Sequence, residues 1–295
     1  MRLALVLILA LAAPWLPPPA AADAPGAVAS IRPVHALLAG VMAGAGEPTL
    51  LVDGAQSPHD FALRPSAARR LAGAGLVVRV GPSLEAFLDR LLPTLADRAR
   101  LVDLVDSPGL VLYPRRPGGD IADSDPHIWL DPENAIVIVD RLAGELAALD
   151  PANAGLYREN ALAMTARIRV LDDELAARLA PLAGLPWVAF HDAWRYFGTR
   201  YGLAPPGILV ADPSVPPGAA RLARIRARIE DEAIRCVFVE PAVADNRLAA
   251  ALVRGTVARV AVLDPLGIDL APGPDLWFGL MRGLADGLVD CLAPD

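Results

Sequence analysis

The chain has 295 residues, of which 54% are hydrophobic, and its 34 acidic and 27 basic residues give a formal net charge of −7. This hydrophobic content excludes a disordered chain, and the length suits one large or two modest globular domains. Every basic residue is an arginine, no basic cluster occurs, and the acidic balance argues against nucleic-acid binding.

The first residues have the layout of a secretory signal peptide. A positive charge at Arg2 precedes an apolar run from Leu3 to Ala13, and the small residues Ala20 to Ala22 offer a cleavage site. The run is too short to span a bilayer, although an uncleaved anchor is the alternative. We predict a signal peptide over residues 1–22 and a soluble, exported mature protein.

Short apolar runs along the chain have the composition of strands buried in parallel sheets. They are Ala27–Ser30, Thr49–Val52, Leu76–Val80, Trp187–Phe190, Cys236–Val239 and Arg259–Leu263. Amphipathic segments predict helices over Ser83–Arg98, capped by Ser83, over Arg221–Glu232 and over Leu276–Leu292. Strands that alternate with helices predict an α/β fold.

The middle of the chain predicts two helices and no strand. The first covers Pro132–Leu149, and the second covers Ala154–Leu179, which would be about 40 Å long. We therefore predict two Rossmann-like α/β lobes with parallel sheets, joined by a long rigid helix. The N-terminal lobe covers 23–150, the linking helix 151–183 and the C-terminal lobe 184–295.

The chain has two cysteines, Cys236 and Cys291. In an oxidising compartment an even pair suggests a disulfide, and two buried free thiols are the alternative. A bridge that closes a loop of this length would stabilise the fold by about 4 kcal/mol in the chain-entropy model.

Three of the four histidines lie in short polar segments that read as turns. His59 follows the strand predicted near Val52, His191 directly follows another strand, and His127 precedes the helix that begins at Pro132. Ligands of open parallel sheets bind beyond the carboxyl ends of the strands, a rule that His59 and His191 satisfy in different lobes. The alternative for each is a hydrogen-bonded loop histidine.

A carboxylate completes the candidate set. Asp264 follows its predicted strand as His191 follows its own, and a turn or cap role before Pro265 is the alternative. Three imidazoles and one carboxylate make a four-ligand set for Zn²⁺, and nitrogen-rich ligation favours zinc over manganese. His35, in the first helix, is expected to be a core or surface residue. Glu240 follows a strand and has two interpretations, orienting a ligand imidazole or forming a structural ion pair.

A series of motifs resembles the zinc-binding subunit of bacterial high-affinity zinc-uptake ABC transporters, a member of the metal-binding group (cluster A-I) of substrate-binding proteins. The motifs are Ser30-Ile31-Arg32-Pro33, Ser57-Pro58-His59-Asp60, Asp125-Pro126-His127-Ile128-Trp129-Leu130-Asp131-Pro132, Phe190-His191-Asp192-Ala193, Val239-Glu240-Pro241 and Leu263-Asp264-Pro265. Together they extend over essentially the whole mature chain, in the order and spacing of the family.

The resemblance implies a metal in the cleft between the lobes, with His59, His127 and His191 as zinc ligands and Asp264 at the position of the fourth. It implies a periplasmic binding protein, not an enzyme, that captures Zn²⁺ and delivers it to the membrane permease of a zinc ABC importer. We expect a monomer. The two cysteines are similar to a disulfide of some zinc-binding members.

Two other functions compete with this interpretation. One is a manganese or iron carrier of the same transporter class. Manganese-binding relatives have what resembles a glutamate at the third ligand position, where this chain has His191, which favours zinc. Many zinc-binding members carry a histidine-rich loop before the second ligand, whereas Tyr113–Ser124 has no histidine here. A zinc hydrolase would need an open fourth position for water, which a carboxylate such as Asp264 would fill.

Overall fold

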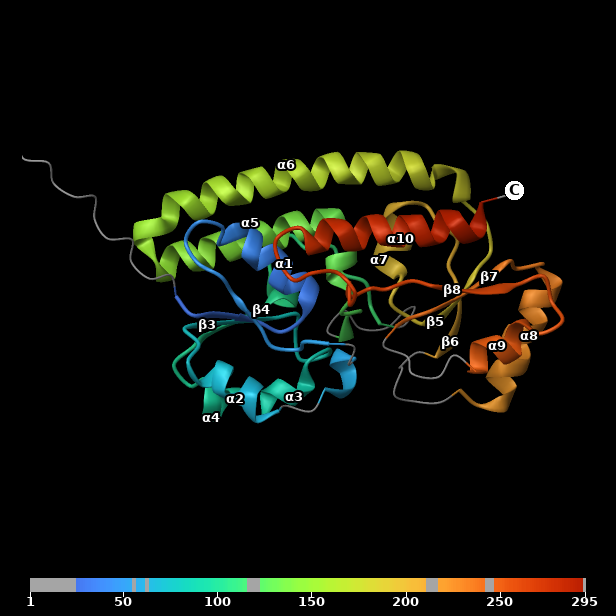
Figure 1. Cartoon of the computed structure of the whole chain (residues 1–295), viewed down its shortest axis with the longest axis horizontal. Coiled ribbons are helices and arrows are strands. Elements are labelled where there is room, and N and C mark those ends of the chain that lie inside the picture. Colours follow the sequence, from blue (N-terminus) through green and yellow to red (C-terminus); the bar gives the residue numbers. More distant parts are fainter. Residues whose placement is uncertain are drawn as a thin grey trace, which may run out of the picture.

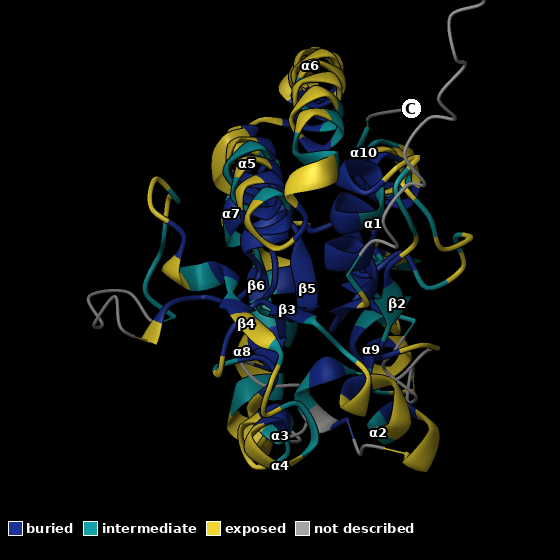
Figure 2. Ribbon diagram, turned by 90° about the vertical axis from the view of Figure 1, so that its left-hand side faces the viewer, coloured by how far each residue is buried: buried dark blue, intermediate teal, exposed yellow. Residues whose placement is uncertain are grey.

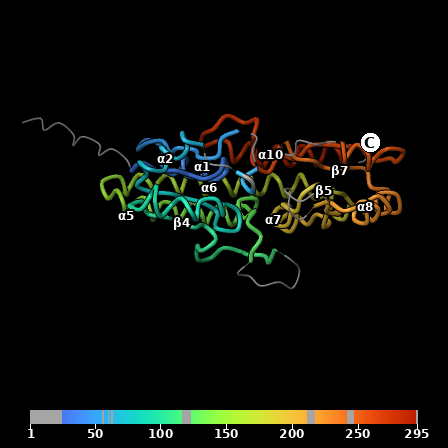
Figure 3. The backbone as a smooth tube through the Cα atoms, turned by 90° about the horizontal axis from the view of Figure 1, so that it is seen from below, coloured from blue at the N-terminus to red at the C-terminus, as the bar shows by residue number. Residues whose placement is uncertain are grey.

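The computed structural model describes residues 25–54, 57–61, 64–115, 123–210, 217–241 and 247–293, so the predicted signal peptide lies outside the described residues. Two four-stranded sheets lie in the two halves of an elongated molecule (Figure 1). Figure 3 shows the halves following one another along the long axis, with β4 (Arg100–Asp103) in one half and α8 (Ala219–Asp231) in the other. The predicted two-lobed α/β fold is confirmed.

The first sheet has the strand order β2-β1-β3-β4, and all of its strands are parallel. Its strands are β1 (Ala27–Ala29), β2 (Thr49–Leu50), β3 (Leu76–Arg79) and β4 (Arg100–Asp103). Side chains alternate between its faces, since Val28 and Val77 pack in one apolar cluster whereas Ala29 and Val78 pack in another. Both faces are therefore covered, as in other parallel sheets.

The second sheet has the order β6-β5-β7-β8 and is also parallel. Its strands are β5 (Val188–His191), β6 (Gly207–Val210), β7 (Cys236–Val239) and β8 (Arg259–Val262). The register places Ala189 opposite Phe238, so the carboxyl ends of β5 and β7 lie at the same edge of the sheet. That edge faces the first lobe.

Helices cover both sheets and connect them. They are α1 (Arg32–Val41), α2 (Pro65–Ala72), α3 (Ala86–Asp89), α4 (Leu92–Leu95), α5 (Pro132–Leu149), α6 (Ala154–Leu179), α7 (Arg195–Arg200), α8 (Ala219–Asp231), α9 (Arg247–Val253) and α10 (Leu276–Leu292). Helix α6 extends over both lobes along the top of Figure 1, with α10 alongside it. In Figure 2 α6 has an exposed side, whereas most of β5 in the interior is buried. Within the described ranges, no helix combines the length and the apolarity that a membrane span requires.

Helix α10 contacts both lobes, so it does not belong to the C-terminal lobe alone. By sequence it belongs to the predicted C-terminal lobe, yet it packs on α1 and α6 as well as on β8. The final helix thus joins α6 in holding the two halves together. The boundaries 23–150, 151–183 and 184–295 stay predictions.

Two edge strands and one helix break differ from the sequence expectation. Strand β4 begins with the exposed residues Arg100 and Leu101, so it lacks the apolar run of a buried strand. Strand β6, in contrast, is a largely buried apolar run after a proline pair, and it was not predicted from the sequence. The single helix predicted over Ser83–Arg98 is wrong, because α3 and α4 are separate short helices. Pro93 lacks the N–H that a helix interior needs, and it lies in the first turn of α4.

A disulfide joins Cys236, the first residue of β7, to Cys291 near the end of α10. The predicted pairing is confirmed. Both cysteines are buried in the main apolar cluster. The bridge therefore fixes the helix that crosses both lobes to a central strand of the second sheet.

Glu85, which falls within the helix predicted over Ser83–Arg98, is fully buried at the carboxyl ends of β1 and β3. Its carboxylate accepts hydrogen bonds from the Ser30 hydroxyl and from the N–H groups of Val80 and Gly81. Burial nevertheless raises the pKa of Glu85 from 4.5 to about 7. The folded state thus binds this proton more tightly than the unfolded chain.

Stability should therefore fall as the pH rises from about 4.5 to about 7, the interval between the unfolded and folded pKa values of Glu85. Between pH 5 and pH 8 we expect the free energy of unfolding of the parent to decrease by about 2 to 3 kcal/mol relative to that of Glu85→Gln, which does not titrate. Urea unfolding of both proteins at the two pH values measures this difference. An equal pH dependence in the two would contradict the raised pKa.

Candidate metal centre

Three histidines from three separate segments converge at the junction of the two lobes. Each of His59, His127 and His191 offers a ring nitrogen, and the three nitrogens lie within 4.8 Å of one another. The ring centroids are 5.9 Å apart for His59 and His127, 5.3 Å for His59 and His191, and 4.9 Å for His127 and His191. The sequence predicted these three residues, and the fold brings them together.

A short turn presents His59. Residues Pro58–Asp60 form one turn of 3₁₀ helix, whose first position suits the fixed backbone angle of Pro58. The hydroxyl of Ser57 accepts a hydrogen bond from the backbone N–H of His59, at 3.3 Å, and so caps the turn. The Ser-Pro-His sequence thus encodes the local geometry.

His127 is held by the aspartate two residues before it. One carboxylate oxygen of Asp125 accepts from the backbone N–H of His127, at 3.0 Å, and lies 2.7 Å from its Nδ1. Burial raises the pKa of Asp125, but His127 outweighs this effect and the net pKa lies below its usual value. Because an ionised carboxylate only accepts hydrogen bonds, Nδ1 carries the proton and Nε2 keeps its lone pair.

His191 is the last residue of β5 and is 3% exposed. Its Nδ1 lies 3.0 Å from Oε1 of Glu240, which follows the neighbouring strand β7. Burial lowers the pKa of His191, but the Glu240 carboxylate outweighs burial, so the net pKa is raised. In the neutral imidazole, as for His127, the proton lies on Nδ1 and the lone pair of Nε2 is available.

The cavity between the three imidazoles is small. Its volume is about 20 Å³, which is enough for one water-sized particle but not for an organic ligand. Its walls are Ser57, Pro58, His59, His127, Trp129, His191, Glu240, Pro265 and Leu266. The site therefore suits a single ion.

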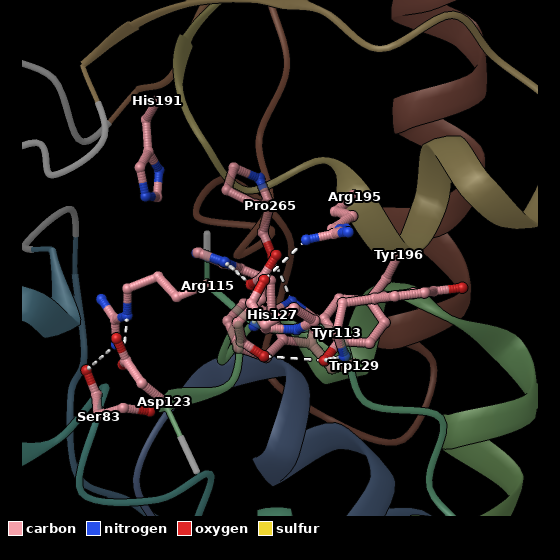
Figure 4. Close-up of polar contacts among 12 residues, drawn as sticks. Ser83, Tyr113, Arg115, Asp123, His127, Trp129, His191, Arg195, Tyr196 and Pro265 are labelled. Atoms are coloured by element: carbon pink, nitrogen blue, oxygen red, sulfur yellow. Dashed lines mark hydrogen bonds and ion pairs between the residues drawn. The ribbon is translucent and has the colours of Figure 1, made fainter. Parts of the chain in front are cut away.

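On one side of the cavity, contacts between the lobes surround the loop after β8. The indole N–H of Trp129 donates to the carbonyl oxygen of Pro265, at 2.8 Å. Arg32, at the start of α1, donates to the carbonyl oxygens of Gly267 and Leu270. Figure 4 shows Trp129 and Pro265 beside His127, with His191 on a different segment of the chain.

On another side, α7 of the second lobe contacts the segment that leads to His127. The Tyr196 hydroxyl donates to the carbonyl oxygen of Asp125, at 2.9 Å, and Arg195 donates to that of Pro114, at 2.7 Å. The Arg195 guanidinium also lies 4.9 Å from the centre of the Tyr113 ring (Figure 4). The lobes thus contact each other on two sides of the imidazoles.

Asp264 is not part of the group of three imidazoles, nor does it line the cavity. Its two carboxylate oxygens accept hydrogen bonds from the backbone N–H groups of Leu266 and Ile268. Burial raises the pKa of Asp264, although these hydrogen bonds oppose that shift. In this arrangement Asp264 shapes the turn that places Pro265 and Leu266 against the cavity.

Of the other residues considered, His35 lies away from the site, whereas Asp125 and Glu240 contact its imidazoles. His35 is buried in α1, where its Nε2 lies 3.0 Å from the carbonyl oxygen of Pro48, and it is outside the group of three. The role of Asp125 was not predicted from the sequence, although an acid two residues before a candidate ligand was a usable signal. Glu240 was considered, but the partner imidazole was visible only in the fold.

This arrangement can bind a small cation with a preference for imidazole nitrogen. Neutral imidazole is a good ligand for zinc and other late transition metals, whereas manganese prefers more oxygen ligands. The model for the ZnuA family, described as the periplasmic component A of the zinc-uptake complex, matches residues 27–291. The chain belongs to this family.

Similar proteins agree with the ZnuA assignment. The high-affinity zinc uptake system protein ZnuA of Brucella suis is 36% identical over 312 residues, covering 92% of this chain and 93% of the relative. A crystal structure of ZnuA superimposes with a TM-score of 0.81 at 25% identity, covering 92% of this chain and 100% of that one. A zinc-bound ZnuA deletion mutant, also 25% identical, has a TM-score of 0.79, with coverage of 92% and 100%. ZnuA proteins are periplasmic transport components, and this chain shares their fold and their solute-binding role.

Proposed function

We propose that this chain captures Zn²⁺ in the periplasm and delivers it to the membrane permease of a zinc ABC importer. The observation that carries the proposal is the group of three ring nitrogens within 4.8 Å of one another in a cavity of ion size. The similarity to zinc-uptake proteins over nearly the whole chain supports zinc as the cargo.

Each imidazole has a defined role in this proposal. His59 and His127 from the first lobe and His191 from the second bind Zn²⁺, the latter two through Nε2, because Nδ1 of each faces a carboxylate. Because the ligands come from both lobes, the bound ion links the halves. Binding of Zn²⁺ therefore favours the arrangement in which the two lobes lie against each other.

The fourth position is a separate question. Asp264 was predicted to fill it and stays a prediction, since both of its oxygens accept backbone N–H groups here. Ligation by Asp264 requires its turn to move toward the imidazoles, whereas a water molecule requires no such movement. Three imidazoles and a water are also the ligands of a catalytic zinc site, but the cavity of about 20 Å³ is too small for an organic substrate, which argues against a hydrolase.

A metal-binding experiment tests the function. Purified protein, stripped of metal and then dialysed against equal concentrations of Zn²⁺ and Mn²⁺, should retain one equivalent of zinc and little manganese. We expect this selectivity because imidazole ligands favour zinc over manganese. Elemental analysis by mass spectrometry measures the amounts of both metals.

Anomalous diffraction at the zinc edge from crystals of the loaded protein then locates the ion. We expect one peak between the three imidazoles. Retention of manganese in place of zinc would favour the alternative cargo, and retention of neither metal would refute the proposed function.

A further inference from the structure

Glu240 is buried beside the candidate metal centre at the carboxyl end of β7. Its side chain is 9% exposed, and Oε1 lies 3.0 Å from Nδ1 of His191. A buried carboxylate is costly without a partner, because it loses its hydration. The His191 imidazole supplies a hydrogen bond that offsets this cost, so the two side chains stabilise one another.

The sheet itself sets this contact. Strands β5 and β7 are hydrogen-bonded neighbours, with Val188 opposite Val237 and Ala189 opposite Phe238. Two positions further along each strand, the same register brings His191 level with Glu240. The pair therefore belongs to the rigid end of a central strand pair and does not depend on a flexible loop.

The hydrogen bond also selects the tautomer of His191. An ionised carboxylate has no proton to donate, so Nδ1 must carry the hydrogen in this contact. In the neutral imidazole Nε2 is then unprotonated, and both residues line the ion-sized cavity. The contact thus orients the imidazole before any ion arrives, and in the neutral form it leaves Nε2 free to bind metal.

In the first lobe, too, a carboxylate contacts Nδ1 of a proposed ligand imidazole, but this carboxylate comes from the same segment of the chain. Asp125 holds Nδ1 of His127 at 2.7 Å, but it lies two residues away in the same segment. The two carboxylates thus anchor one imidazole in each lobe. Only Glu240 does so from a separate strand, 49 residues away.

We propose that Glu240 is a positioning residue for zinc binding, which fixes the orientation and tautomer of His191 without itself being a ligand. This inference rests on the proposed function, since it names the residue that prepares one of the proposed ligands. A hydrogen-bonding partner of a metal-ligating histidine changes metal affinity by about 10- to 100-fold when it is removed.

Three variants test the inference through zinc affinity, measured by competition with a chromogenic chelator. Glu240→Ala should weaken binding by about 10- to 100-fold. Glu240→Gln should weaken it less, because the amide oxygen can still accept from Nδ1. Glu232→Ala should keep the parent affinity, because it removes an exposed carboxylate that pairs with Arg228 on the surface of the same lobe.

A second measurement separates this inference from the proposed function. Nitrogen-15 NMR of the imidazoles in the metal-free protein at pH 8 should show His191 protonated at Nδ1 in the parent and a mixture of tautomers in Glu240→Ala. Unchanged zinc affinity in Glu240→Ala, or Nε2 protonation in the parent, overturns the role of Glu240. A parent protein that binds no zinc overturns the proposed function, and the NMR result still tests the positioning of His191.

Discussion

Replacing His191 by alanine is expected to weaken zinc binding by well over the 10- to 100-fold that loss of a ligand's hydrogen-bonding partner costs. The variant loses one of the three nitrogen ligands. The lost ligand is the one imidazole of the three that comes from the second lobe, at the end of β5. The remaining imidazoles, His59 and His127, both belong to the first lobe. Zinc bound to them alone would no longer hold the halves together.

Competition titration with a chromogenic chelator measures the affinity, and circular dichroism checks that the variant remains folded. His35→Ala is the matched control, because it removes the fourth histidine. His35 lies in α1, contacts the carbonyl oxygen of Pro48 and is outside the group of three. This control should bind zinc as the parent does. Parent-like affinity in His191→Ala would refute its assignment as a ligand.

Asp264→Ala adds a comparison that addresses the fourth ligand. All three imidazoles remain in this variant, so its loss of zinc affinity should be smaller than that of His191→Ala. Thermal stability should fall, because the N–H groups of Leu266 and Ile268 lose their acceptor. A loss of affinity equal to that of His191→Ala would make Asp264 an equal partner in the site.

Removing the disulfide is expected to lower the free energy of unfolding by about 2 to 5 kcal/mol. The bridge joins residues 55 positions apart, and for such a loop the chain-entropy model gives about 4 kcal/mol. The double variant Cys236→Ala/Cys291→Ala is preferable to serine, because both positions are buried and a serine hydroxyl would need a new partner.

Urea unfolding of the parent, the double variant and the chemically reduced parent measures the effect. The variant and the reduced parent should show similar losses. Zinc affinity should change little, because Cys236 begins β7 whereas Glu240 follows its other end. An unchanged unfolding midpoint in the variant would show that the bridge contributes nothing to stability under these conditions.

The long helices were predictable because local chemistry marks both of their ends. Helix α5 begins at Pro132 after the capping carboxylate of Asp131 and ends before Asp150, as the sequence indicated. The bounds of α6 and α10 were predicted with equal success. Helix α10 was predictable from its helical apolar pattern, and α6 from a long stretch without a proline or a glycine after Gly155.

The short edge elements were not predictable in the same way. Strand β4 contains charged residues at both ends, since an edge strand exposes one side to solvent. The helix expected over Ser83–Arg98 is interrupted just before Pro93, between α3 and α4. The carboxylate of Glu85 accepts hydrogen bonds at the end of β3 and does not cap a helix. Burial of an acid among backbone N–H groups depends on the strands that supply them.

The sequence by itself determined the fold class, the cysteine pair and the identities of the three histidines, because each has a local or compositional signal. Only the tertiary structure decided that the three ring nitrogens meet, that Glu240 faces His191, and that the carboxylate of Asp264 turns toward its own loop. Strand order and register set these contacts between residues far apart in the chain, and single-residue patterns contain no record of either.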